Sequence, residues 1–233
     1  MKTKPLTFLL ALTFLFLFSG SSVVFGGNLQ DGVDAYEIKD YETAYKLWLP
    51  LAEQGFAQAQ YNLGVMYEKG QGVPQDYKEA VKWYRLSVEQ GDVSALYNLG
   101  VMYSNGQGVL QDYKKAVIMY RLSAIQGHAD AQFNLGVMYD NGLGVPQDYK
   151  EAVRLYRLSA EQGNAEAQYN LGLMYYKGTG VLQDYALAHM WFNLSGSNGN
   201  KQAVKNRNIV EKKMTPSQIE KAQEMARNWK PNK

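Results

Sequence analysis

Apolar and polar residues of positions 57–200 follow a helical spacing, and the whole pattern recurs every 36 residues. The clearest mark of this period is a Leu-Gly pair, found at Leu63-Gly64, Leu99-Gly100, Leu135-Gly136 and Leu171-Gly172. A fixed period of this length predicts helical hairpins, because each unit buries its apolar face only against its neighbours. Arrays of this kind usually bind other molecules along a continuous surface.

Each period predicts two helices joined by a glycine-containing loop. In the first complete copy, the apolar and aromatic residues of 57–69 fall on one helical face, and Gly70 ends the helix. Asp76 is expected to cap the second helix, with Glu79 completing a capping box. The same pairing is expected at Asp148 and Glu151. The small residues, such as the glycine of each Leu-Gly pair, are expected to let the two helices approach closely.

The two ends of the array depart from the repeat. Lys39 alone is expected to separate the first helix from Asp40, and Pro50 is expected to kink the helix that follows. A last helix is expected to begin at Thr215 and to run to about Trp229. The predicted organisation is a leader at 1–26, an atypical hairpin at 27–56, four complete repeats at 57–200, a partial repeat with a capping helix at 201–230, and a tail at 231–233.

The N-terminal segment has the layout of a secretory signal peptide. Lys2 and Lys4 precede an uncharged apolar run at 6–18, and small residues lead to an expected cleavage site at 24–26. The alternative is an uncleaved membrane anchor, but the run is shorter than the roughly 20 residues that cross a bilayer. We therefore expect a periplasmic or secreted protein with no stable membrane insertion after cleavage.

Charge and cysteine content exclude several classes of function. The chain has 24 Lys and Arg against 22 Asp and Glu, so it has no general basic field for nucleic acid. Residues 200–233 carry nine basic and three acidic side chains, while the body is acidic. This basic end either makes weak contact with an anionic partner or surface, or is a solvated cap. No cysteine is present, which removes disulfides, thiolate metal sites and cysteine nucleophiles.

The repeat unit resembles a known family. The residues that carry the resemblance are Ala59-Gln60-Tyr61-Asn62-Leu63-Gly64-Val65-Met66-Tyr67, Gly70-x-Gly72-Val73, Asp76-Tyr77 and Ala80-x-x-Trp83-Tyr84. They are similar to the Sel-one-like repeat, a relative of the tetratricopeptide repeat with a longer internal loop. The resemblance implies an all-α fold, a right-handed α/α solenoid with the first helix of each hairpin on its concave side. Members are mostly scaffolds or adaptors for protein partners.

The resemblance also places a candidate binding groove on the first helices, and helical geometry independently puts these positions on one face. The copies differ mainly there, which indicates either that each unit reads a different part of a partner or that a solvated surface has drifted. An aromatic residue recurs on this face and is a candidate binding anchor. The expected partner-binding residues are Gln58, Tyr61, Val65, Glu68, Lys69, Ser94, Tyr97, Val101, Asp130, Phe133, Val137, Asp140, Glu166, Tyr169, Leu173, Tyr176 and Lys177.

Other recurring polar residues favour structural roles. Asn62, Asn98, Asn134 and Asn170 abut the packed Leu-Gly pair and are expected to satisfy backbone or neighbouring-repeat groups rather than to clamp a peptide. The Gly-x-Gly loops follow helices and lack a Gly-Lys-Ser/Thr sequence, so they are expected to be turns, not phosphate sites. Of the two histidines, His128 is expected to be an exposed helix cap and His189 to be partly buried.

Three hypotheses of function follow. The first is a non-enzymatic scaffold that binds a protein or peptide in an acidic, aromatic-lined groove, with no cofactor and no metal. The second is an envelope hydrolase directed at β-lactams or peptidoglycan, although the residues show no nucleophile-and-base set. The third is a structural protein that assembles with itself.

Overall fold

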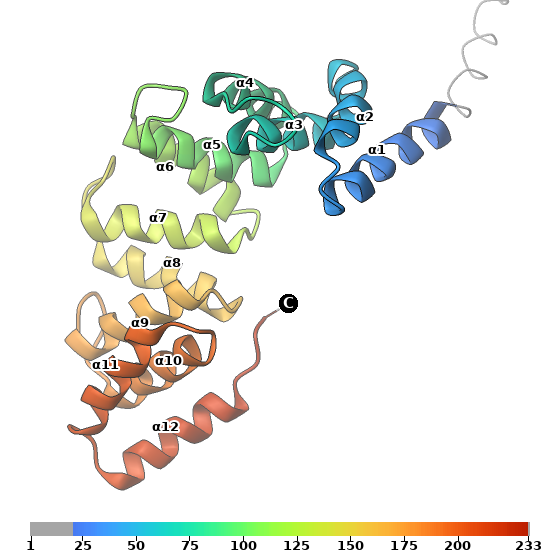
Figure 1. Cartoon of the computed structure of the whole chain (residues 1–233). Helices are drawn as coiled ribbons and strands as arrows, with labels where there is room; N and C mark the ends of the chain where they lie inside the picture. The colour runs from blue at the N-terminus through green and yellow to red at the C-terminus, as the bar shows by residue number, and fades with distance from the viewer. Residues whose placement is uncertain (1–20, 233) are drawn as a thin grey trace, which may run out of the picture. The chain divides into compact units, whose positions relative to one another are not determined.

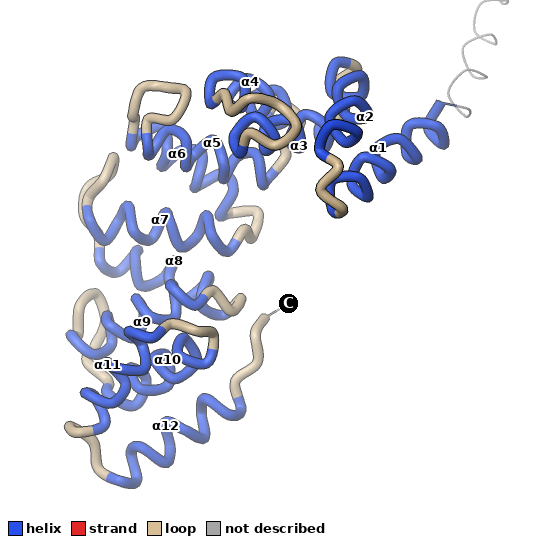
Figure 2. Tube along the Cα trace, in the orientation of Figure 1, coloured by secondary structure: helices blue, strands red, loops and turns tan. Residues whose placement is uncertain are grey.

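The computed structural model describes residues 21–232, with side chains from residue 29 onward, and this part of the chain is entirely helical. Twelve helices join through short turns and loops, and no strand occurs among the described residues (Figures 1 and 2). They are α1 (Ser21–Glu37), α2 (Tyr41–Glu53), α3 (Ala57–Lys69), α4 (Tyr77–Val88), α5 (Val93–Asn105), α6 (Tyr113–Ala124), α7 (Ala129–Asn141), α8 (Tyr149–Glu161), α9 (Ala165–Lys177), α10 (Tyr185–Ser197), α11 (Lys201–Glu211) and α12 (Pro216–Asn228). The predicted all-α fold of repeating helical hairpins is confirmed.

The chain divides into two compact units, one ending at Gln90 and the other beginning at Gly91. In the first unit, α1 pairs with α2 and α3 pairs with α4 around a core that includes Trp48, Leu63 and Trp83. Ile38 as well as Lys39 separates α1 from the N-cap residue Asp40, one residue more than predicted. Lys39 adopts a left-handed backbone conformation with φ of 67°, which glycines adopt in the corresponding turns of later repeats.

The second unit contains three hairpins of equal design, α5–α6, α7–α8 and α9–α10. Each first helix ends on a glycine in the left-handed conformation, and each second helix begins at an aspartate N-cap. The Asp148 side chain accepts hydrogen bonds from the backbone N–H groups of Lys150 and Glu151. The predicted capping box is wrong, because the Glu151 carboxylate pairs with Arg154 at 2.7 Å instead of returning to the cap. In the first unit, Glu79 likewise pairs with a lysine, Lys82.

Small residues hold the two helices of each hairpin together. Gly136 of α7 lies against the ring of Tyr156 in α8, and the buried Ser159 hydroxyl donates a hydrogen bond of 2.8 Å to the carbonyl of Ala129. The first contact joins the two helices at the middle of the hairpin, and the second joins them at its open end. Their counterparts in the second unit are Gly100–Tyr120 and Ser123–Val93, and Gly172–Phe192 and Ser195–Ala165.

The C-terminal end closes the second unit. Thr215, where the last helix was expected to begin, caps α12 in a capping box, in which the Thr215 hydroxyl and the Gln218 side chain exchange hydrogen bonds with each other's backbone. The helix packs on α10 and ends at Asn228, with Trp229 as its C-cap residue. Beyond it, the Asn232 backbone N–H donates to the carbonyl of Glu161 at 2.7 Å, so the tail is held at the end of α8.

The predicted leader lies largely outside the described residues, which begin at residue 21. The expected cleavage site at 24–26 falls within the first turns of α1. None of the helices in the described part of the chain is long and apolar enough to cross a membrane.

Candidate functional site

The predicted partner-binding residues of the second unit lie on α5, α7 and α9, the first helices of its three hairpins. The recurring aromatic residues Tyr97, Phe133 and Tyr169 are half-buried, because each ring packs against a buried ring of the second helix of its own hairpin. The ring centroids of Phe133 and Tyr156 are 5.9 Å apart. The other two pairs are Tyr97–Tyr120 at 6.1 Å and Tyr169–Phe192 at 5.8 Å. The aromatic row therefore contributes to hairpin packing as well as to the surface.

His128 joins this row in a way that the sequence did not reveal. It is the N-cap of α7, and its Nδ1 accepts a hydrogen bond from the backbone N–H of Ala131 at 3.3 Å. The imidazole stacks on the ring of Tyr97, with centroids 4.8 Å apart. The predicted cap is confirmed, but the residue is half-buried rather than exposed because of this stacking.

Two acidic positions of the predicted groove are fixed by the following repeat. The Asp130 carboxylate accepts a hydrogen bond of 2.7 Å from the Nδ2 amide of Asn164, the N-cap residue of α9. The Glu166 carboxylate accepts one of 3.1 Å from Asn200, the N-cap residue of α11. These carboxylates are exposed on the surface and held in place by the neighbouring hairpin.

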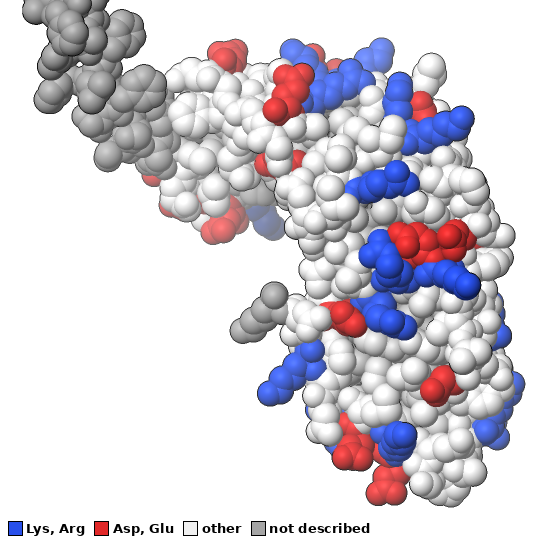
Figure 3. All heavy atoms as spheres, turned by 180° about the vertical axis from the view of Figure 1, so that it is seen from behind, with Lys and Arg blue, Asp and Glu red and all other residues white. Residues whose placement is uncertain are grey.

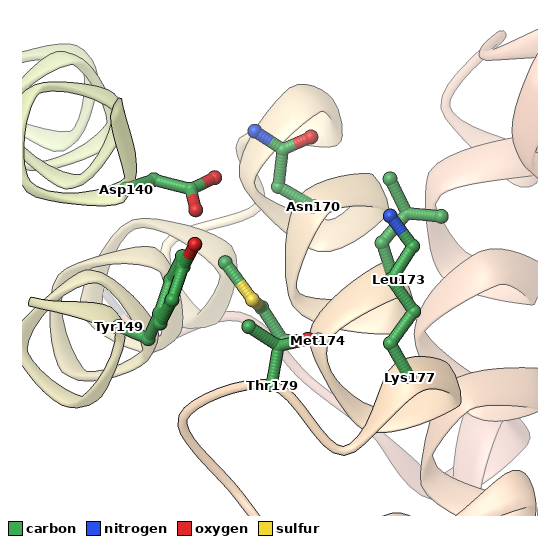
Figure 4. Close-up of a pocket in the computed structure, with 7 residues that line it drawn as sticks. All are labelled: Asp140, Tyr149, Asn170, Leu173, Met174, Lys177 and Thr179. Atoms are coloured by element: carbon green, nitrogen blue, oxygen red, sulfur yellow. The ribbon is translucent and has the colours of Figure 1, made fainter. Parts of the chain in front are cut away.

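A cavity of about 220 Å³ opens between the third and fourth complete repeats. Its residues come from α7, from the beginning of α8, from α9 and from the loop after α9: Asp140, Tyr149, Asn170, Leu173, Met174, Lys177 and Thr179. Figure 4 shows Asp140 and Tyr149 on one side, Leu173 and Lys177 on the other, and Met174 between them. The structure thus brings three predicted binding residues together in one cavity, namely Asp140, Leu173 and Lys177.

A hydrogen-bond network holds the polar wall of this cavity. The buried hydroxyl of Tyr156 donates to Asp140 at 3.1 Å and accepts from the Asn170 amide. Burial is the main cause that raises the pKa of Tyr156 well above its usual value, and the Asp140 charge raises it further. Asn134 makes the corresponding hydrogen bond to Tyr120 of the preceding repeat. These asparagines therefore join successive hairpins, which is the structural role that the sequence indicated.

Tyr149, Met174 and Thr179 were not among the predicted site residues. Tyr149 begins α8, Met174 belongs to the buried stripe of α9, and Thr179 lies in the loop after α9. The prediction considered one face of each first helix, whereas the cavity also takes residues from the second helix and the loop. The 36-residue period was the sequence signal that could have identified these residues, because the second helix and the loop recur beside the first helix in every copy.

The predicted residues of the first unit lie on α3. Tyr61 packs on Tyr84 with ring centroids 5.9 Å apart, and Gln58 donates a hydrogen bond to Asn62. The Tyr84 hydroxyl donates to the Glu68 carboxylate, as Tyr156 does to Asp140 in the second unit. The remaining two predicted residues are Val65, which is half-buried, and Lys69, which is exposed.

His189 is fully buried in α10, more deeply than predicted. Its Nε2 lies 2.8 Å from Oε1 of Glu211 in α11, while its Nδ1 has no hydrogen-bond partner. Within the residues that the structure describes, no group of three or more His, Cys, Asp or Glu side chains is placed to hold a metal ion.

Comparison with known proteins identifies the repeat. A family model for the Sel1 repeat matches residues 28–56, 57–92, 93–128, 129–164 and 165–200. The chain belongs to the Sel1 repeat family. These matches include an incomplete first repeat before the four complete ones, and members of this family generally mediate protein–protein interactions.

Solved structures of Sel1 repeat proteins resemble this chain. A Sel1 repeat protein from Oxalobacter formigenes is 31% identical, with a TM-score of 0.77 over 92% of both chains. A protective antigen of uropathogenic Escherichia coli with an SLR fold is 32% identical, with a TM-score of 0.60; the match covers 91% of this chain and 54% of the antigen. A Sel1 repeat protein from Klebsiella pneumoniae shares the fold at 22% identity and a TM-score of 0.54, over 84% of this chain and 97% of that one. No curated protein sequence matches the chain significantly.

Proposed function

We propose that this Sel1 repeat protein is an exported, non-enzymatic scaffold that holds a segment of a protein partner against α7 and α9. The observation that carries the proposal is the cavity between these helices, because it collects residues at positions that vary between repeats. Glu68, Ser104 and Tyr176 stand in the other copies where Asp140 stands here, and Lys69, Asn105 and Asn141 where Lys177 stands. Among the junctions between complete repeats, only this one combines an acidic residue at the first position with a lysine at the second position of the following repeat.

The size and lining of the cavity define what it accepts. Its volume of about 220 Å³ lies below the roughly 300–1,000 Å³ of pockets that enclose small-molecule ligands. One side chain of a bound segment is a better match. Leu173 and Met174 supply apolar contact for that side chain, while Asp140 and Lys177 offer hydrogen bonds to the polar groups on either side of it.

The acidic positions at the beginnings of α7 and α9 support an extended contact along these helices rather than an isolated pocket. Asp130 and Glu166 are held by Asn164 and Asn200, so their carboxylates are already oriented before a partner arrives. Preorganised polar groups lower the entropic cost of binding and fix the register of a bound segment. A partner segment with basic side chains beside an apolar anchor fits this arrangement.

The proposal is tested by affinity capture from an envelope extract with purified residues 27–233 as bait. The test variant is Asp140→Ser with Lys177→Asn, which installs residues that other repeats carry at the same positions. This choice protects the fold, since Ser104 makes a hydrogen bond to Tyr120 where Asp140 bonds Tyr156. The control variant is Leu110→Pro, at an exposed loop position where Pro74 stands in the first copy.

A partner retained by the unaltered bait and by Leu110→Pro, and lost from the double variant, supports the proposed site. Equal capture of the same proteins by all three baits contradicts it, and so does the absence of any specific partner. Phe133→Ala is a poorer choice for this test, because Phe133 also packs on Tyr156 and its loss would disturb the hairpin.

Export requires its own measurement. The whole chain, expressed with its leader, is expected to be found outside the cytoplasm with a mature N-terminus near residue 27. Protein that stays in the cytoplasm with residue 1 intact would remove export from the proposal without affecting the binding site.

A further inference from the structure

One face of α6, continued by its C-cap residue Ile125, carries three exposed aliphatic side chains. Ile118, Leu122 and Ile125 retain 49%, 42% and 75% of their accessible surface. They are spaced by four and three residues along the chain, so they lie on the same side of the helix. In α8, Arg154 and Glu161 occupy the first and last of these positions, as expected for a helix face in water. We call Ile118, Leu122 and Ile125 the α6 face.

The chain itself contains a covered version of this face. Two periods further along, Met190 and Leu194 of α10 occupy the positions of Ile118 and Leu122, and they are only 6% and 9% exposed. Leu158 occupies the second position in α8, between α7 and α9, and remains 37% exposed. The additional burial on α10 therefore comes with α12, the extra helix that packs on it.

Helix α12 shows how this face is covered. Ala222 and Ala226 are buried, Met225 and Trp229 pack against the same core as Met190 and Leu194, and the opposite side of the helix is polar and exposed. The Trp229 ring meets that of Trp191 edge-on, with centroids 6.3 Å apart. An amphipathic helix is thus the element that this protein already uses to cover the corresponding positions.

The charges around the α6 face narrow the choice of partner. Lys114, Lys115 and Arg121 lie three or four residues from Ile118, and no acidic residue occurs from Tyr113 to Gln126. The N-cap residue Asp112 lies 3.7 Å from the Lys115 ammonium, so Lys114 and Arg121 carry most of the free positive charge beside the apolar residues. Two copies of this face brought together would oppose like charges, which disfavours a symmetric dimer through it. Elsewhere on the surface the charges are mixed: the side of the molecule drawn in Figure 3 shows Lys and Arg side chains interspersed with small groups of Asp and Glu.

We propose that the α6 face docks an amphipathic helix of a partner protein, one with acidic side chains beside its apolar stripe. The apolar stripe takes the place that α12 takes on α10, and the acidic side chains meet Lys114, Lys115 and Arg121. This is the helix-on-helix mode of recognition, in which residues at i, i+3, i+4 and i+7 anchor the contact. The face belongs to the second helix of its hairpin, so this proposal stands apart from the site on α7 and α9.

The probe is a peptide of residues 215–230, because this sequence covers the corresponding face of α10. In this peptide Ser217→Asp allows a side-chain lactam to Lys221, which keeps the peptide helical and lies on the side that is exposed in α12. Arg227→Glu makes the peptide acidic. A basic control peptide carries the same lactam and Arg227, with Glu220→Lys and Glu224→Lys. Circular dichroism establishes the helicity of both peptides before use. Binding of the fluorescein-labelled peptides to the full chain is measured by anisotropy.

Two protein variants complete the test. Ile118→Arg with Ile125→Glu installs the residues that α8 carries at these positions, Arg154 and Glu161, so the fold is preserved. Leu182→Pro is the control, since it removes a still more exposed leucine from a loop and installs the residue found at Pro74 and Pro146.

The acidic peptide is expected to bind the unaltered chain and the Leu182→Pro control with the same affinity. Its affinity for the Ile118→Arg/Ile125→Glu variant is expected to be lower by about tenfold or more, because burial of two isoleucines is lost. The basic peptide is expected to bind the unaltered chain more weakly than the acidic one. Three results would overturn the proposal. They are no binding of the helical acidic peptide to the unaltered chain, equal binding to the double variant, and self-association or binding to phosphatidylglycerol vesicles that the double variant abolishes.

Discussion

The ring of Tyr156 lies so close to Gly136 that a Cβ atom at this glycine would fall 2.8 Å from two ring carbons. Real Cβ atoms essentially never approach a neighbour this closely. Since the ring is fully buried, it has little room to move away. The spacing of α7 and α8 is therefore set by the absence of a side chain at Gly136.

Gly136→Ala is expected to destabilise the protein by about 1–3 kcal/mol, even though alanine is the better helix former, because the added methyl overpacks the hairpin. Urea unfolding monitored by circular dichroism measures the change. Asn141→Ala, at an exposed position of the same helix, is the control and is expected to stay within about 0.5 kcal/mol. A Gly136→Ala protein as stable as the unaltered chain would show that the ring can yield.

The stability of the second unit is expected to fall in alkali. Burial raises the pKa of Tyr156 and of Tyr120 above the value of about 10 that tyrosine has in an unfolded chain. Above this pH the unfolded chain loses these protons while the folded protein retains them, so the free energy of unfolding decreases as the pH rises.

Tyr156→Phe with Tyr120→Phe is expected to cost about 1 kcal/mol per lost hydrogen bond at pH 8, but to make the decline above pH 10 shallower. Urea unfolding at pH 8 and at pH 11 separates the two effects. A decline of unchanged steepness in the double variant would mean that other groups cause it.

Substitution of the two members of the His189–Glu211 pair is expected to change the free energy of unfolding by different amounts. His189→Val installs the residue found at Val81, Val117 and Val153, and removes a buried Nδ1 that has no partner. Its net effect on the free energy of unfolding is expected to stay within about 1 kcal/mol. Glu211→Ala is expected to cost about 1–3 kcal/mol, because it leaves both ring nitrogens buried without a partner. Chemical denaturation of both variants checks this order, and the reverse order would contradict it.

The N-cap of α8 is expected to matter more than its apparent capping-box partner. Asp148→Ala removes an acceptor for two backbone N–H groups and is expected to cost about 1 kcal/mol. Glu151→Ala breaks an exposed pair with Arg154 and is expected to cost about 0.5 kcal/mol or less. Thermal denaturation compares the two variants, and equal losses would point to a capping role for Glu151 that its present geometry does not show.

The helices could be predicted because the same structural requirement recurs in several copies of the repeat. Glycine is needed where Gly70 ends α3 in the left-handed conformation, and aspartate is needed where Asp148 caps α8. Because the same residue recurs at the same position in several repeats, such positions can be recognised from the sequence. The prediction for Glu151 was wrong because this residue lies three positions after Asp148, which suits a capping box, and three positions before Arg154, which suits an ion pair. Sequence spacing does not distinguish between these two contacts.

The candidate site was less predictable, because it depends on what differs between copies. Asp140 and Lys177 were found from one helix face, but the cavity also needs Tyr149 from the next helix and Thr179 from a loop. Whether these segments leave a space depends on side-chain packing, which the period does not encode. The α6 face is a similar case, since its exposure is evident only beside the covered positions of α10.

The hydrogen bonds from Asn134 to Tyr120 and from Asn170 to Tyr156 join each hairpin to the one before it at the same sequence offset. If residues 129–164 were removed as a block, Asn170 would stand where Asn134 stood, and Tyr120 would find an identical donor. Duplication of the same block would supply one further copy of each group. The chain can therefore lengthen or shorten by whole units without leaving either of these buried tyrosine hydroxyls unpaired.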